Sequence, residues 1–170
     1  MRIGVLSDTH GALHPAIATS FTGVDEIFHL GDVGTQRILD ELEAIAPVTA
    51  VSGNMDPPGL VAHLPESKVV TRANRRIVLL HGHRVRAAEP VELLRATRPD
   101  RPDLVLFGHT HEPLLEELEG VTFFNPGAAG KPRFRSRPTI GLLEITLTGM
   151  RLEHRALEGP FGSSVEERRR

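Results

Sequence analysis

Short apolar segments recur along the first half of the chain, and each ends at a glycine or a polar residue. The segments 3–6, 26–30 and 48–51 have the length and character of short buried strands. Between the last two, residues 35–45 carry apolar side chains at helical spacing, and residues 12–20 are compatible with a shorter helix. This alternation of strands and helices predicts a parallel sheet covered by helices.

The second half of the chain is predicted to hold another sheet. The segments 68–70 and 76–80 are typical of a hairpin, and a helix over 88–97 and a strand over 104–107 are expected to follow. Four further segments alternate or run apolar with glycine between them, and they are predicted as antiparallel strands: 114–118, 121–124, 139–147 and 150–157. The whole pattern predicts two sheets packed together with helices outside.

Length and charge narrow the class of protein. The chain has 170 residues, enough for one domain with a hydrophobic core. We expect that domain to span residues 1–158 and a polar, frayed tail to follow over 159–170. The net charge of -2 gives no electrostatic footprint for nucleic acid, so long DNA or RNA is not an expected partner. The absence of cysteine excludes disulfides and thiolate zinc sites.

The apolar segments are too short for a membrane protein. None approaches the roughly 20 residues that span a bilayer. Met1-Arg2 is followed by only four apolar residues, so no signal peptide is expected. These patterns predict a cytoplasmic protein, and they leave open whether it forms a homo-oligomer.

Residues of the metal-ligand type follow five of the predicted strands. They occur in the segments Asp8-Thr9-His10, Gly31-Asp32, Gly53-Asn54-Met55-Asp56, His81-Gly82-His83 and Gly108-His109-Thr110-His111. Ligands of open α/β sheets bind beyond the carboxyl ends of the strands, so these segments can meet in one crevice. Imidazole, carboxylate and amide groups suit divalent Mn, Fe, Co, Ni or Zn. One such segment alone is weak evidence, but five in this arrangement predict a metal site.

Spacing, glycine and charge support that prediction. Asp8 and His10, like His109 and His111, are two residues apart, and in extended backbone such side chains point the same way. Glycine beside most of these residues permits the close backbone approach that a compact site needs. Two aspartates, two divalent ions and one hydroxide sum to about +1, a charge that attracts a phosphate ester.

The order of these segments resembles the calcineurin-like metallophosphoesterase superfamily. Its motifs run D-x-H, G-D, G-N-x-[DE], H-G-H or G-H, and G-H-T-H, and the resemblance covers the chain to about residue 150. The short length and Asn125-Pro126-Gly127 look like the small bacterial and archaeal phosphodiesterase branch. The resemblance implies an α/β fold, a four-layer α/β/β/α sandwich of two mixed sheets flanked by helices. It also implies two divalent metal ions as cofactors, with manganese the leading candidate.

The same resemblance implies a role for each motif. It implies seven metal ligands in three groups: Asp8, His10 and His111 for the first ion, Asn54, His81 and His109 for the second, and Asp32 as the bridge. Asp32 and Asn54 would therefore be catalytic as well. The implied reaction is hydrolysis of a small phosphodiester or nucleotide by in-line attack of a hydroxide that bridges both ions.

One position departs from the family pattern. Many members carry histidine after the Asn54 position, where it is thought to protonate the leaving group, but this chain carries Met55. Met55 argues against the phosphoprotein-phosphatase branch and leaves the general acid open between His83 and water. We interpret Asp56 as a residue that orients its loop, and His29 as structural.

Two questions stay open at this point. Lys131, Arg133, Arg135 and Arg137 form either a contact for substrate phosphate, led by Lys131 and Arg133, or an exposed basic loop. The activity is either that of a phosphodiesterase or that of a phosphomonoesterase. A weakly active interaction scaffold is the third alternative, because the small subunit of the retromer coat resembles this fold and has little activity. The presence of all seven ligand positions favours an enzyme.

Overall fold

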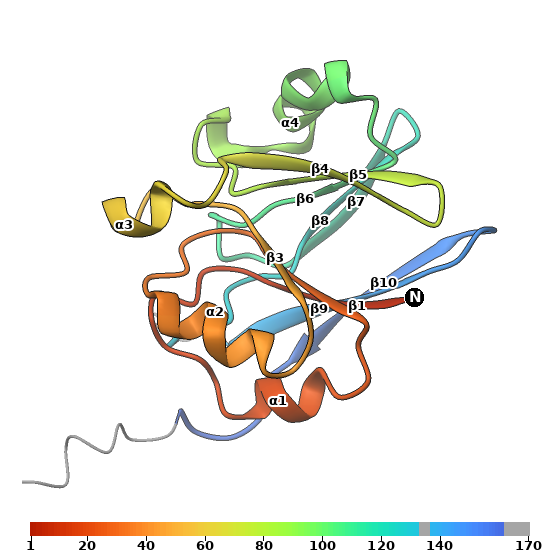
Figure 1. The fold of residues 1–170 in the computed structure, drawn as a ribbon. Helices are drawn as coiled ribbons and strands as arrows, with labels where there is room; N and C mark the ends of the chain where they lie inside the picture. Colours follow the sequence, from red (N-terminus) through yellow and green to blue (C-terminus); the bar gives the residue numbers. More distant parts are fainter. Residues whose placement is uncertain (133–136, 162–170) are drawn as a thin grey trace, which may run out of the picture.

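The computed structural model describes residues 1–132 and 137–161. Its main elements are two five-stranded sheets packed face to face, with helices on their outer sides (Figure 1). This arrangement confirms the predicted four-layer sandwich of mixed sheets. Within the described ranges, no helix has the length and apolar character needed to cross a membrane.

The first sheet has the strand order β10-β9-β1-β2-β3. Its strands are β1 (Arg2–Leu6), β2 (Glu26–His29), β3 (Val48–Ala50), β9 (Thr139–Ile145) and β10 (Met150–Ala156). β1, β2 and β3 are parallel, as the alternation of strands and helices predicted. β9 pairs antiparallel with β1, so the late part of the chain completes the sheet that the early part begins.

Helices α1 (Ala16–Ser20) and α2 (Gln36–Glu43) lie on the outer face of the first sheet (Figure 1). Their apolar faces explain this position, because Ile17 and Ile38 are fully buried against Leu6 and Ile27. Both helices are shorter than the segments predicted for them. Phe28 and Val5 point from the opposite face into the core between the sheets.

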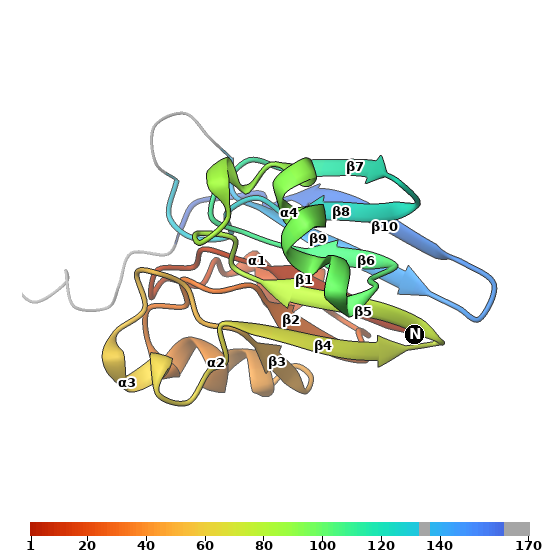
Figure 2. The same cartoon turned by 90° about the horizontal axis from the view of Figure 1, so that it is seen from above.

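The second sheet has the order β4-β5-β6-β8-β7. Its strands are β4 (Ser67–Arg72), β5 (Arg75–Leu80), β6 (Leu104–Leu106), β7 (Leu114–Leu118) and β8 (Val121–Asn125). Helix α4 (Pro90–Thr97) covers its outer face (Figure 2). Two 3-10 turns flank this helix, η1 (Arg86–Ala88) and η2 (Arg98–Asp100).

The prediction that residues 121–124 form an antiparallel strand needs a correction. β8 is antiparallel to β7 but parallel to β6, because the β7–β8 hairpin turns its buried strand inward. Phe123 and Phe124 of β8 are fully buried, whereas the exposed Glu116 and Glu117 of β7 suit the sheet edge. The residues after Asp56 form helix α3 (Pro58–Val61), for which the sequence pattern gave no prediction and which begins with proline in its first turn.

The last described residues return to the first sheet's helical layer. The His14 ring contacts the Gly159 carbonyl oxygen through Nε2 at 3.2 Å and packs edge-on against Phe161. The start of the predicted tail is therefore packed against the domain. The rest of that tail, residues 162–170, lies outside the described residues.

Candidate metal centre

The loops after β1 and β2 run side by side beyond the ends of their strands. The backbone amide of Asp8 donates to Gly31 at 3.0 Å, that of His10 to Asp32 at 2.9 Å, and that of Gly11 to Val33 at 2.8 Å. These bonds extend the parallel pairing of the strands into the loops. They hold Asp8 (0% exposed) and Asp32 (3% exposed) at one edge of the sheet.

The backbone of the ligand-type residues is left-handed. The φ angles of Asp8, His10, Asp32, His109 and His111 are 57°, 47°, 53°, 70° and 61°. The expectation that each pair two residues apart lies in extended backbone is therefore wrong. The side chains converge because each loop turns sharply at its strand end. Left-handed residues other than glycine cost about 1 kcal/mol or more, and they persist where the surrounding structure fixes them.

Glycine permits two of these close approaches, as predicted. A Cβ atom at Gly53 would collide with the Asp32 carboxylate and its backbone nitrogen. A Cβ atom at Gly108 would collide with the Ser7 hydroxyl and lie 2.9 Å from Asp8 Oδ2. The loops from both sheets therefore approach each other more closely than any other residue type would allow.

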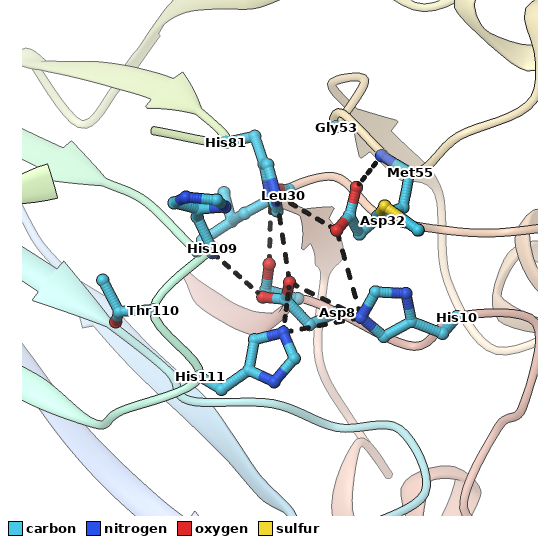
Figure 3. A network of polar contacts seen from close by, with 12 residues as sticks. Asp8, His10, Leu30, Asp32, Gly53, Met55, His81, His109, Thr110 and His111 are labelled. Carbon is cyan, nitrogen blue, oxygen red and sulfur yellow. Dashed lines mark hydrogen bonds and ion pairs between the residues drawn. The ribbon is translucent and has the colours of Figure 1, made fainter. Parts of the chain in front are cut away.

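Two carboxylates and three imidazoles meet in one cluster (Figure 3). Asp8 Oδ1 lies 3.1 Å from His111 Nε2 and 3.9 Å from both His10 Nε2 and His81 Nε2. Asp32 Oδ2 lies 3.3 Å from His81 Nε2 and 3.9 Å from His10 Nε2. Two sets of three donors fall within 4.8 Å of one another, and Asp8 is common to both: Asp8 with His10 and His111, and Asp8 with Asp32 and His81.

The chemistry of the buried atoms fits a bound cation. His81 Nδ1 lies 2.8 Å from the Leu30 carbonyl oxygen, which only accepts, so this nitrogen carries the proton. In the neutral ring, Nε2 then presents a bare lone pair toward the carboxylate of Asp32. Neither His81 Nε2 nor Asp8 Oδ1 has a hydrogen-bond partner among the described residues, although both are buried. A positive ion between these lone pairs removes their mutual repulsion.

The electrostatics keep both carboxylates ionised. Burial raises the pKa of Asp8 and of Asp32, but the close contacts and charge interactions with the neighbouring histidines bring both pKa values below their ordinary value. Burial lowers the pKa of His81, and its contacts with Asp32 and Asp8 more than offset that effect, so its pKa is raised. A partly buried site with two negative charges attracts cations.

His109 and Asn54 lie at the exposed side of this cluster. The backbone amide of His109 donates to Asp8 Oδ2 at 3.1 Å, and its ring centroid is 5.2 Å from that of His81. Met55 follows Asn54 in the chain, and its backbone amide donates a hydrogen bond to Asp32 Oδ1 at 2.7 Å. The Asn54 side chain is exposed and, within the described part of the chain, makes no hydrogen bond or ion pair.

Asp56 orients the Gly53–Asp56 turn, as its position in the sequence indicated. Its two carboxylate oxygens accept from the amides of Gly34 and Gly53, each at 2.8 Å. These bonds place the turn that carries Asn54 beside Asp32. Asp56 therefore acts on the arrangement of the loops rather than on a bound ion.

The remaining predicted site residues occupy two sides of the cluster. The His83 ring centroid lies 5.5 Å from that of His81 and 6.4 Å from that of His109. Burial and the nearby charges of His81 and Arg84 lower the pKa of His83. Lys131 lines a small pocket whose other walls include Asp8, His10, His111 and Arg137. Arg133 and Arg135 lie outside the described residues.

Sequence reasoning missed Asn125 as a site residue. This fully buried amide donates from Nδ2 to the Gly108 carbonyl oxygen at 2.9 Å and to Thr110 Oγ1 at 3.0 Å. Its Oδ1 accepts from the Gly127 amide at 2.9 Å. Asn125 thus holds the loop that carries His109 and His111. The available signal was an asparagine before Pro-Gly at the end of a buried strand.

His29 also acts on the site, from the helical side of the first sheet. Thr9 Oγ1 donates to the Val33 carbonyl oxygen at 3.0 Å, so in its 2.9 Å contact with His29 Nε2 the hydroxyl accepts. Thr9 lies between Asp8 and His10 in the chain, so this network connects the two loops of the first sheet. Complete burial lowers the pKa of His29 to about 3, and the ring is neutral. The structural interpretation of His29 agrees with these contacts.

A face-to-face pair of mixed sheets with aspartates and histidines at the strand ends is the architecture of metal-dependent phosphoesterases. Residues 1–148 match the calcineurin-like phosphoesterase superfamily domain, and the chain belongs to this superfamily. The chain is 35% identical over 150 residues to a probable metallophosphoesterase of Methanothermobacter thermautotrophicus, covering 85% of this chain and 86% of the relative.

Two further similarities bear on function. A phosphodiesterase of Methanocaldococcus jannaschii is 30% identical over 163 residues, covering 85% of this chain and 93% of the relative. The solved structure of Vps29 from Entamoeba histolytica in complex with zinc superimposes with a TM-score of 0.77 at 25% identity, covering 92% of this chain and 99% of Vps29. The small archaeal and bacterial branch implied by the motifs is thereby confirmed.

Proposed function

We propose that this protein is a phosphodiesterase that hydrolyses small phosphodiesters or nucleotides with two divalent metal ions. The observation that carries the proposal is the pair of three-donor sets that share the buried carboxylate of Asp8. One set is partly open to solvent through His10 and His111, which leaves room for a substrate. The similarity to the phosphodiesterase of M. jannaschii supports a phosphodiester, rather than a phosphomonoester, as the substrate.

The proposed ligands are the seven residues named from the family motifs. Asp8, His10 and His111 would hold the first ion and Asn54, His81 and His109 the second, with Asp32 between them. Both Asp8 and Asp32 lie between histidines of the two groups. When bound, two such ions activate water near neutral pH and neutralise charge on the phosphoryl oxygens. Manganese is our leading candidate, and zinc is the ion named with Vps29.

The chain's own residues would bind and orient the ester. Lys131 and Arg137 line the pocket beside His10 and His111, where their charges can hold the phosphoryl oxygens. Arg133 is proposed to join them. Met55 is 61% exposed beside Asn54, and its thioether has no proton to give to a leaving group. His83 is the proposed proton donor, since its ring lies beside those of His81 and His109.

The test compares diester and monoester hydrolysis in one preparation. Bis(p-nitrophenyl) phosphate and p-nitrophenyl phosphate are assayed with Mn²⁺, Ni²⁺ or Zn²⁺, and with a chelator as control. We expect faster diester turnover that the chelator abolishes. Faster monoester turnover would establish the phosphomonoesterase alternative instead.

A stability measurement in the same buffers separates an enzyme from a scaffold. An ion at one hundred times its dissociation constant should raise the free energy of unfolding by about 2.7 kcal/mol. Metal-dependent stabilisation without turnover of either ester would contradict the proposed activity and favour an interaction scaffold. Neither stabilisation nor turnover would contradict the metal site as well.

A further inference from the structure

A second pocket lies next to the metal centre and has His81 in its lining. It has a volume of about 200 Å³ and lies between β5, the start of β4 and the end of α4, on the outer side of the second sheet. His81 and His83 form the wall that it shares with the metal centre. His81 belongs both to the lining of this pocket and to one of the two donor sets, so the pocket and the metal centre are adjacent.

The interior of this pocket is mainly apolar. Val78, Leu80, Val85 and Ala96 contribute side chains to its lining. Val78 and Leu80 belong to β5, Val85 to the segment after it, and Ala96 to α4. The strand and the helix therefore both contribute to the lining. Such a surface favours a flat organic group over a hydrated ion.

The carboxylates among the lining residues of the pocket outnumber the permanently charged cations by two to one. Glu66 and Asp100 stand against one cation, Arg84, which forms an ion pair with Glu66. The pocket on the other side of the metal centre instead carries Lys131 and Arg137. This difference in charge disfavours a second phosphate in the apolar pocket. It favours a neutral group that donates hydrogen bonds to carboxylates.

His83 adds an unsatisfied polar atom to the shared wall. Its Nδ1 is buried and has no hydrogen-bond partner among the described residues. A buried ring nitrogen of this kind normally finds a partner, so a ligand or a water is the natural complement. The His83 ring lies beside that of His81, with ring centroids 5.5 Å apart, and His83 lines the apolar pocket.

We propose that this pocket binds the organic group of the phosphodiester, and that this group is a single neutral ring with hydrogen-bond donors, such as an amino-substituted nucleobase. The inference rests on the proposed function for the position of the phosphate. The pocket volume lies below the roughly 300 Å³ at which sites for larger ligands begin, which fits one ring system. The apolar lining packs against the faces of the ring, and the carboxylates accept from its amino group.

Ala96 offers a way to fill the pocket without touching the metal ligands. It lines the pocket from α4, and its side chain is exposed in the helix. Ala96→Phe adds an aromatic ring there. The matched control is Ala18→Phe, because Ala18 is an exposed alanine of α1 on the other sheet's outer face.

The test uses calorimetric binding of cytidine and uridine to the metal-loaded protein. Cytidine presents an amino donor where uridine presents a carbonyl acceptor. We expect wild type and Ala18→Phe to bind cytidine more tightly than uridine, and Ala96→Phe to bind cytidine about tenfold more weakly. Equal binding of cytidine by wild type and Ala96→Phe would overturn the proposal, as would a preference for uridine.

An activity comparison distinguishes failure of this inference from failure of the proposed function. The p-nitrophenyl ester of cytidine 5′-monophosphate and methyl p-nitrophenyl phosphate share a leaving group and differ in the ring. We expect Ala96→Phe to lower kcat/KM for the first ester alone. Unchanged values for both esters would overturn the pocket assignment. Binding of cytidine that Ala96→Phe weakens would support the pocket even if no diester were hydrolysed.

Discussion

The two sheets contribute to the metal centre in different ways. The first-sheet half, comprising Asp8, His10 and Asp32, is held by backbone hydrogen bonds that continue the pairing of β1 with β2. The second-sheet half comprises His81, His109 and His111. It is held by one backbone bond between its loops, from the Gly108 amide to the His81 carbonyl oxygen, and by the side chain of Asn125, which holds the loop of its last two members. Its His109 is exposed, whereas both aspartates of the first-sheet half are buried.

The negative charge of the centre therefore lies in its buried half, and the solvent-exposed ring of His109 lies in the other half. The paired backbone fixes the Cα positions of both buried aspartates, so we expect these carboxylates to determine where an ion can bind. His109 and His111 lie on the more exposed side of the centre, where we expect the proposed substrate to approach. We therefore expect changes in the first-sheet half to remove metal binding. Changes around the second-sheet half should weaken it by degrees.

Asp8→Asn should have the largest effect. It removes the one charge common to both donor sets, so we expect the loss of bound metal and a fall in kcat/KM of about a thousandfold or more. The metal content of the purified protein measures the first effect, and steady-state hydrolysis of a diester measures the second. The matched control is Asp40→Asn, which should behave like wild type. Asp40 is an exposed residue of α2 whose carboxylate accepts only from Gln36 among the described residues. Full metal content in Asp8→Asn would refute the shared role.

Asn125→Ala should weaken the second-sheet half alone. The loop of His109 and His111 loses the hydrogen bonds to Gly108 and Thr110, so we expect metal affinity to fall about 10- to 100-fold. Calorimetric titration should show both binding steps weakened, because His111 is proposed for the first ion and His109 for the second. Thr110→Val removes one of these bonds and should give a smaller effect. A titration of folded Asn125→Ala that matches wild type would show that the loop holds its shape without this amide.

His29→Gln should give the smallest effect, which is a change in how the free energy of unfolding depends on pH. The pKa of His29 is about 3 in the folded protein against 6.5 when unperturbed, so only the unfolded chain gains this proton as the pH falls below 6.5. Stability from the neutral ring is present above that pH and is lost toward pH 3. Between about pH 7.5 and pH 5.5, metal-free wild type should lose about 1.4 kcal/mol more than His29→Gln.

Urea unfolding at the two pH values measures this difference. Glutamine keeps an N–H donor for Thr9 and has no titrating group, so the contact survives while the pH dependence is removed. The raised pKa of His81 contributes in the opposite direction, but equally in both proteins. Equal losses of stability in wild type and His29→Gln would show that burial of His29 does not determine the acid sensitivity.

Most of the fold could be predicted because its strands are short, apolar and separated by clear turns. The motifs after β1, β2, β5 and β6 were placed correctly because each follows such a strand. The direction of β8 could not be predicted from alternation alone, since pairing depends on which strand of the hairpin is buried. The buried pair Phe123-Phe124 was the local signal for an interior strand.

Within the site, residue types were predictable and backbone geometry was not. The spacing of Asp8 and His10 suggested extended backbone, but both residues are left-handed because the loop is fixed by pairing with Asp32 and its neighbours. A backbone conformation that is fixed by contacts with another loop cannot be predicted from the spacing of residues in the sequence. The same is true of Asn125, whose partners lie 15 and 17 positions earlier in the chain.

The position of β9 has a consequence for how the protein is made. β1, the strand that carries Asp8, lies between β2 and β9, and its pairing with β9 joins Val5 to Gly141. A nascent chain that has just passed His111 already contains every proposed ligand, but the partner strand for β1 has not yet been synthesised. Long-range pairing of this kind is slow to form. We therefore expect the metal centre to form only after the ribosome has added the β9–β10 hairpin, a segment that supplies none of the proposed ligands.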